Sequence, residues 1–163
     1  MKQKSNNNKK GELDIVRFFN APIEKVWQAW TDPEAVKKWW GPKDFTAPHV
    51  KMDFKVNGKY LFCMKGPDGK EYWSTGIYKE IVPNEKIVMT DSFADEKGNV
   101  VSATNYGMEG FPLELEVILN FKKMENGKTE MTLQHSEFPE GQIMDLTRQG
   151  WNQSFDKLEE SLK

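Results

Sequence analysis

Hydrophobic and polar residues alternate along most of the chain between about residues 45 and 136, as in strands that bury one face. The clearest example is the stretch 113–121, in which every second residue is apolar. Asn-Gly pairs at 57–58 and 126–127 are strong signals for tight hairpin turns. Because tight turns join neighbouring strands, this part of the chain predicts an antiparallel sheet in a meander.

Three other segments repeat apolar residues every three or four positions, which is the period of a helix. Two short helices are expected in succession at 22–31 and 33–40, each opened by a capping residue and a proline. Gly41-Pro42 ends the second. A much longer helix is predicted from 139 to 162, with one apolar stripe about six turns long.

The order of these elements predicts an α+β fold. A first strand at 13–19 precedes the two short helices, and the meander and the long helix follow. Together these make a curved antiparallel sheet of about six or seven strands, whose apolar face the long helix must cover. A gap between sheet and helix would be a natural pocket. Residues 1–10 have nothing to bury and are expected to form a disordered tail, leaving one domain over 11–163.

Composition narrows the function classes. Aromatic residues make up 12% of the chain, which excludes disorder for its bulk. A net charge of −2 gives no general attraction to nucleic acid or to an anionic membrane, and the longest apolar run, Tyr60 to Met64, is far too short to span one. No apolar segment follows the basic N-terminus, and Cys63 is the only cysteine. We therefore expect a cytoplasmic protein with no nucleic-acid partner and no membrane insertion.

Six segments carry a resemblance to a known family. They are FNAPIEKVWQAW (19–30), TDPEAVKKWWGP (31–42), MDFKVNGKY (52–60), GPDGKEYWSTGIY (66–78), NYGMEGFP (105–112) and GWNQSFDKLEESL (150–162). In this order they resemble the helix-grip fold of the SRPBCC (START-like) superfamily, and within it the bacterial single-domain branch named for the activator of heat-shock-protein-ninety ATPase. The chain departs from common members at Asn57-Gly58, where two glycines are usual, and at Lys55, where many have arginine.

The resemblance implies several functions, because members of the superfamily bind lipids or hormones, cyclise polyketides, sequester antibiotics or assist a chaperone. The leading hypothesis is a binding protein for a small lipophilic or aromatic molecule, held between the sheet and the C-terminal helix without catalysis. The alternatives are a co-chaperone-like domain that activates a heat-shock chaperone ATPase, and a polyketide cyclase- or hydrolase-like enzyme. A homodimer is a further alternative. An interior packed solid by Trp151, Phe155 and their neighbours would refute the leading hypothesis of a ligand held between sheet and helix.

Catalytic signatures are missing from the sequence: it has no nucleophile elbow, phosphate loop, dinucleotide fingerprint or metalloprotease helix. We expect no catalytic residue, no metal and no cofactor. Asp91 and His135 are the polar candidates for ligand binding. If the bulky face of its strand turns inward, Asp91 lies in an apolar wall and orients a ligand, or acts as an acid or base. If the strand twists outward, Asp91 is solvated. His135 either faces the same cavity or is hydrogen-bonded at the end of a strand.

The other candidates are aromatic side chains and methionines. Each has two interpretations, as part of an adaptable pocket wall or as ordinary core. Trp39 and Trp40 end a short helix and either gate a pocket or pack under the sheet, whereas Cys63 is expected to be a buried core thiol. The candidate ligand-binding residues are Trp39, Trp40, Tyr60, Phe62, Met64, Trp73, Asp91, Phe93, Tyr106, Met108, Phe111, His135, Trp151 and Phe155.

Overall fold

The computed structural model describes residues 11–136 and 141–163. The expected tail at 1–10 and the expected start of the long helix at 139–140 lie outside these residues. The elements are β2 (Leu13–Phe19), α1 (Ile23–Thr31), α2 (Pro33–Val36), β3 (Thr46–Met52), β4 (Lys59–Lys65), β5 (Glu71–Val82), β6 (Lys86–Ala94), the 3₁₀ turn η1 (Ala103–Tyr106), β7 (Leu115–Lys123), the 3₁₀ turn η2 (Glu125–Gly127), β8 (Thr129–Ser136) and α3 (Gln142–Ser161).

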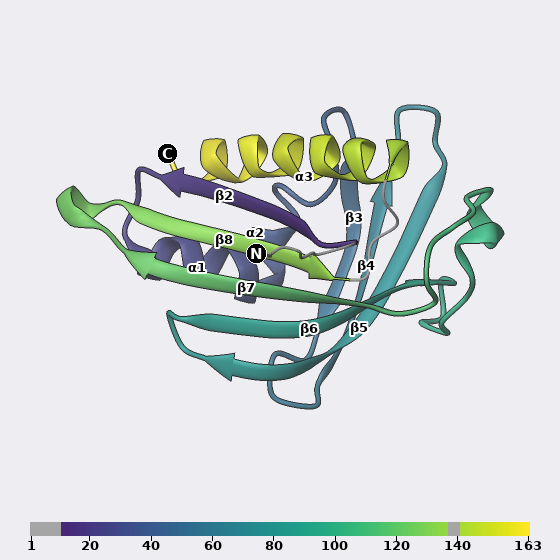
Figure 1. Ribbon diagram of the computed structural model, residues 1–163, viewed down its shortest axis with the longest axis horizontal. Coiled ribbons are helices and arrows are strands. Elements are labelled where there is room, and N and C mark those ends of the chain that lie inside the picture. Colours follow the sequence, from purple (N-terminus) through teal and green to yellow (C-terminus); the bar gives the residue numbers. More distant parts are fainter. Residues whose placement is uncertain (1–10, 137–140) are drawn as a thin grey trace, which may run out of the picture.

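Within the described residues, seven strands form one antiparallel sheet in the order β2-β8-β7-β6-β5-β4-β3. From β3 to β8, strands that are consecutive in the sequence are also neighbours in the sheet. The first strand, β2, pairs with the last strand, β8, although the two are far apart in the sequence. The sheet is strongly curved, and α3 runs alongside β2 (Figure 1). This arrangement confirms the predicted α+β helix-grip fold, with two short helices between β2 and β3. No helix in the described part of the chain is long and apolar enough to cross a membrane.

Two predicted elements are shorter than the sequence pattern suggests. Helix α2 ends at Val36, because the amides of Lys38 and Trp39 bond to carbonyls only three residues back and form turns. Gly41 with φ 104° and Pro42 then follow. Strand β3 ends at Met52, although apolar residues alternate as far as position 56. Asp53–Gly58 instead forms a tight turn, in which the amide of Gly58 donates to the carbonyl of Lys55 at 2.8 Å. Asp53 and Lys55 form an exposed ion pair at 3.6 Å within this turn.

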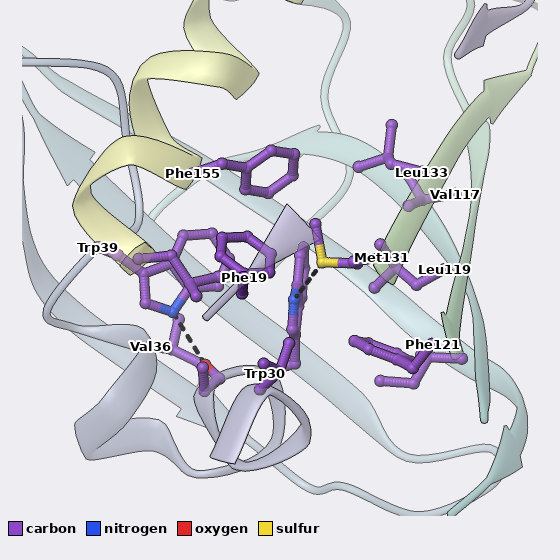
Figure 2. Close-up of a cluster of buried hydrophobic side chains, with 14 of the residues drawn as sticks. Phe19, Trp30, Val36, Trp39, Val117, Leu119, Phe121, Met131, Leu133 and Phe155 are labelled. Atoms are coloured by element: carbon purple, nitrogen blue, oxygen red, sulfur yellow. Dashed lines mark hydrogen bonds between the residues drawn. The ribbon is translucent and has the colours of Figure 1, made fainter. Parts of the chain in front are cut away.

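The core lies between α1, α3 and the inner face of the sheet. Figure 2 shows the ring of Phe155 reaching from α3 toward Trp30 and Trp39, with side chains of β7 and β8 on the far side. Buried indole groups are satisfied locally: Trp39 Nε1 donates to the Ala29 carbonyl at 2.9 Å, and Trp30 Nε1 to the sulfur of Met131 at 3.2 Å. The core thus anchors α1, α3 and β8 to one another.

The free edge of β2 is held by α3. Arg148 donates to the backbone carbonyl of Asp14 at 2.7 Å, which satisfies an acceptor that an edge strand would otherwise leave to solvent. Arg17 reaches Asp156 at 2.8 Å and donates to the carbonyl of Asn152 at 3.1 Å. These contacts fix the helix against the first strand, so they also fix the helix relative to the inner face of the sheet.

Gly76 in β5 allows a close approach that prepares the candidate site. A Cβ atom at this position would overlap the Thr90 carbonyl oxygen and the ring of Tyr60. Without it, the Tyr60 ring crosses over β5, and its hydroxyl donates to the Thr90 carbonyl at 2.7 Å. A glycine here therefore places Tyr60 beside Asp91, the next residue of β6.

Candidate functional site

Asp91 lies on the inner face of β6. Its pairing residue in β7 is Leu115, and the neighbouring inward pair joins Met89 to Val117 in the buried core. The bulky face of β6 therefore turns inward, as one of the two interpretations of the sequence supposed. The Asp91 side chain keeps 25% of its surface exposed, so the carboxylate is placed in an apolar wall but within reach of solvent.

His135 lies behind Asp91, near the end of β8, with only 4% of its side chain exposed. Its Nε2 is 3.2 Å from Oδ2 of Asp91. On the other side of the ring, Trp151 Nε1 of α3 donates to Nδ1 of His135 at 3.3 Å. Asp91, His135 and Trp151, which we call the polar relay, thus connect β6, β8 and the long helix through side chains.

Tyr60 completes the polar surroundings of Asp91. Burial raises the pKa of Tyr60 well above its usual range, and the negative charge of Asp91 raises that pKa further. The phenol consequently stays protonated at neutral pH and remains a donor to the Thr90 carbonyl. Tyr60 therefore adds a neutral hydroxyl, and no second negative charge, beside the Asp91 carboxylate.

Half-buried aromatic rings gather beside Asp91. Phe93, two residues further along the same face of β6, lies 5.6 Å from the ring of Tyr106 and 5.6 Å from that of Phe111. The Tyr106 hydroxyl donates to the Ala94 carbonyl, which ties the loop between β6 and β7 to the sheet. We call Asp91, Phe93, Tyr106 and Phe111 the aromatic end. Met108 is half-buried in the same loop.

The deeper part of the inner face is filled by side chains. Trp39, Tyr60, Phe62 and Phe155 are all buried. Trp40, half-buried, lies 4.8 Å from Phe62, and Tyr60 lies 4.6 Å from Phe62. These ring contacts argue against the deep cavity between sheet and helix that the leading hypothesis of the sequence analysis supposed. Any binding in this region is consequently confined to the aromatic end.

Two surface hollows lie elsewhere. One of about 460 Å³ is lined by Lys38, Lys43, Lys157 and polar residues of the second half of α3, and another of about 310 Å³ lies near Asn20 and the end of α3. Neither is lined by a candidate residue. The ammonium group of Lys157 donates hydrogen bonds to the carbonyls of Pro42 and Phe45, at 3.1 and 2.9 Å. The first hollow is therefore a seam between α3 and the loop before β3.

Two of the candidate ligand-binding residues, Trp73 and Met64, lie away from the polar relay. Trp73 pairs with Cys63 and stacks on His49, with ring centroids 5.3 Å apart, on the opposite face of the sheet from Phe62. Met64 shares the face of Phe62 but lies against Gly41. Cys63 is buried, as expected, and burial raises the pKa of its thiol to about 11.

Sequence reasoning missed Tyr72, whose ring lies 5.5 Å from that of Tyr106 and extends the aromatic end toward β5. The signal was present, because the Gly66–Gly69 turn pairs Tyr72 with Met64, itself a candidate. The bond between Trp151 and His135 was also missed. No sequence pattern reveals it, because it joins a strand to a helix.

A curved antiparallel sheet with a long C-terminal helix, and with polar residues on its inner face, defines a helix-grip domain. The family model described as "Activator of Hsp90 ATPase homolog 1-like protein" matches residues 20–163, and the chain belongs to this family within the SRPBCC superfamily. No protein of curated function matches the chain.

Several solved structures share the fold. A protein from Chromobacterium violaceum is 25% identical with a TM-score of 0.77, covering 93% of this chain and 96% of its own. One from Staphylococcus epidermidis is 28% identical with a TM-score of 0.74, covering 96% and 92%. An AHSA1 protein from Silicibacter pomeroyi is 20% identical with a TM-score of 0.74, covering 93% and 97%. The similarity spans nearly the whole length of each protein.

Proposed function

We propose that this protein binds a small lipophilic or aromatic molecule at the aromatic end. The observation that carries the proposal is the polar relay: a buried histidine bonded to Trp151 and facing a partly exposed carboxylate, beside half-buried rings. Small-molecule sites are mostly apolar with a few placed polar groups. Asp91, His135 and Trp151 supply the polar groups, and Phe93, Tyr106 and Phe111 supply the apolar surface.

Stability alone does not favour such a relay. Ionisable side chains in an apolar wall lose hydration, and well-packed apolar residues of similar size are often at least as stabilising. A carboxylate that stays a quarter exposed next to a buried imidazole therefore supports a role in recognition. The family points the same way, since ligand binding is one of the activities that the superfamily resemblance implies.

The test is a thermal-shift and native-mass-spectrometry screen of a library of lipophilic aromatic and acyl compounds. A true ligand at 100 times its dissociation constant stabilises the fold by about 2.7 kcal/mol, which corresponds to a rise in Tm of roughly 5–11 °C. Saturation with a stoichiometry of one per chain is expected.

Two phenylalanines provide matched variants. Phe111→Ser removes a half-buried ring of the aromatic end, and Phe18→Ser removes a 57%-exposed ring from the outer face of β2. The ligand-dependent rise in Tm should fall in Phe111→Ser and remain in Phe18→Ser. The proposal is wrong if no compound gives a saturable rise, or if both variants respond equally.

A co-chaperone role is the second candidate, and the family description favours it. In that case the protein would bind a heat-shock chaperone of the ninety-kilodalton class and accelerate its ATP turnover. The measurement is the steady-state ATPase rate of the purified chaperone as this protein is titrated in. An unchanged rate at saturating concentration would count against this candidate and leave the ligand-binding proposal intact.

A further inference from the structure

The contacts of the polar relay determine which edge of His135 faces Asp91. The indole N–H of Trp151 is only a donor, so the Nδ1 atom that it contacts must accept. The proton of a neutral His135 ring is therefore on Nε2, on the side of Asp91. The contact with Trp151 thus leaves the Nε2 edge of His135 facing the Asp91 carboxylate, which keeps a quarter of its surface open to an incoming molecule.

The loop that follows β6 carries further acidic residues. Between Lys97 and Lys122 the sequence has three acidic residues and no lysine or arginine. Of these acids, Glu116 pairs with Lys79 at 2.9 Å and Glu114 also interacts electrostatically with that lysine; Glu109 and Glu114 are both exposed on the loop that carries Tyr106 and Phe111.

The start of α3 does not change this balance. Within its first two turns, Asp145 is exposed and Arg148 is the only basic residue. Arg148 is directed to the Asp14 carbonyl of β2. The aromatic end therefore presents the Asp91 carboxylate to an incoming molecule, and its loop carries the exposed acids Glu109 and Glu114.

The aromatic rings and the Asp91 carboxylate of the aromatic end together suit a ligand that carries an ammonium group. An ammonium group is attracted both to carboxylate oxygens, through charge-assisted hydrogen bonds, and to the faces of aromatic rings. A carboxylate or phosphate on a ligand would instead meet Asp91 as a like charge. We propose that the aromatic end selects ligands that carry a protonated amine on an aromatic or acyl body, with the ammonium beside Asp91 and the apolar body against Phe93, Tyr106 and Phe111. This inference rests on the proposed function and names its ligand class.

Three probes with the same apolar body test the inference: 4-phenylbutylamine, 4-phenylbutanol and 4-phenylbutyrate. Their dissociation constants are measured by isothermal titration calorimetry on the full chain at pH 7. The amine should bind at least about tenfold more tightly than the alcohol, and the alcohol more tightly than the anion. Added salt should weaken the amine more than the alcohol. Equal affinities for the three probes in the wild-type protein would overturn the inference without any variant.

Variants locate the selectivity. Asp91→Asn should reduce the affinity for the amine to that for the alcohol, and Asp91→Glu should restore part of the difference. Asp53→Asn removes one negative charge from an exposed turn away from the aromatic end, so it should leave the selectivity unchanged. Unchanged amine preference in Asp91→Asn would overturn the inference, with far-UV circular dichroism checking that the variant folds.

The outcomes separate the inference from the proposed function. Saturable binding of all three probes with equal affinity would overturn the amine selectivity while the proposed function stands. Binding of none of the three would overturn the selectivity as well. In that case the wider library screen decides the proposed function, which fails only if that screen also finds no saturable ligand.

Discussion

Replacing Phe155 by alanine tests how the long helix is held against the sheet. The Phe155 side chain is fully buried and lies beside Trp30 in the core (Figure 2). Its ring centroid is 6.0 Å from that of Trp30 and 5.4 Å from that of Trp151. Alanine would remove the ring and leave a cavity, because Trp30 sits on a different helix and cannot follow α3 freely. The contact between α3 and α1 would lose its central side chain.

The expected loss follows from this burial. Truncation of a buried phenylalanine to alanine costs about 3–5 kcal/mol, as lost transfer free energy plus the cavity. Each kcal/mol lowers the Tm of a chain of this size by roughly 2–4 °C, so the expected fall is about 6–20 °C. Against a typical total of about 5–15 kcal/mol, that is a large share of the stability.

Urea unfolding followed by tryptophan fluorescence and by far-UV circular dichroism measures the loss. Leu146→Ala is the matched control, since Leu146 is on the same helix but 58% exposed. Its effect should stay within about 0.5 kcal/mol. A loss below about 1 kcal/mol for Phe155→Ala, or an equal loss for Leu146→Ala, would refute the central role of Phe155 in the packing of α3.

The same variant tests whether the interior is filled. An apolar cavity left by a deleted ring stays dry and binds small apolar molecules such as benzene. Benzene should therefore raise the Tm of Phe155→Ala and leave that of the wild-type protein unchanged. An equal rise in both would indicate that the native protein already has a deep cavity.

Three further predictions concern other contacts. Gly76→Ala should cost at least about 2 kcal/mol in urea unfolding, because its Cβ would overlap the Thr90 carbonyl; full stability would contradict that overlap. Arg17→Ala should cost about 1 kcal/mol in low salt and less in high salt, because its ion pair with Asp156 is partly exposed; a cost independent of salt would contradict an ionic contribution. Since burial raises the pKa of Cys63 to about 11, thiol labelling at pH 8 should be at least roughly 100-fold slower in the folded protein than in urea, and equal rates would show an accessible thiolate.

Much of the fold follows from local patterns in the sequence. The alternation at 113–121, the Asn-Gly turns and the helical stripe at 142–161 each depend on neighbouring residues, so each predicts an element before its partners are known. Errors occurred at element ends. The alternation that continues to position 56 resembles a strand, but β3 ends at Met52 because the backbone of Asp53–Gly58 bonds within its own turn.

The candidate site depended far more on tertiary structure. Both faces of β6 carry buried residues, Ile87 and Met89 on one side and Val88 and Ser92 on the other, so the sequence left the direction of Asp91 open. Pairing with β7 decided it. Trp73 is a large aromatic residue of the kind that lines pockets. Its pairing with Cys63 in the neighbouring strand nevertheless places it on the outer face of the sheet.

What the sequence determined by itself was the kind and order of the elements, because backbone propensity, turns and periodicity act over a few residues. Only the tertiary structure decided which side chains meet. His135 and Trp151 are 16 residues apart, and their bond exists because α3 is held against β2 and the core. Whether aromatic residues line a cavity or fill it likewise depends on the space left between α1, α3 and the sheet. That space is set by how these elements pack together, which the sequence does not show.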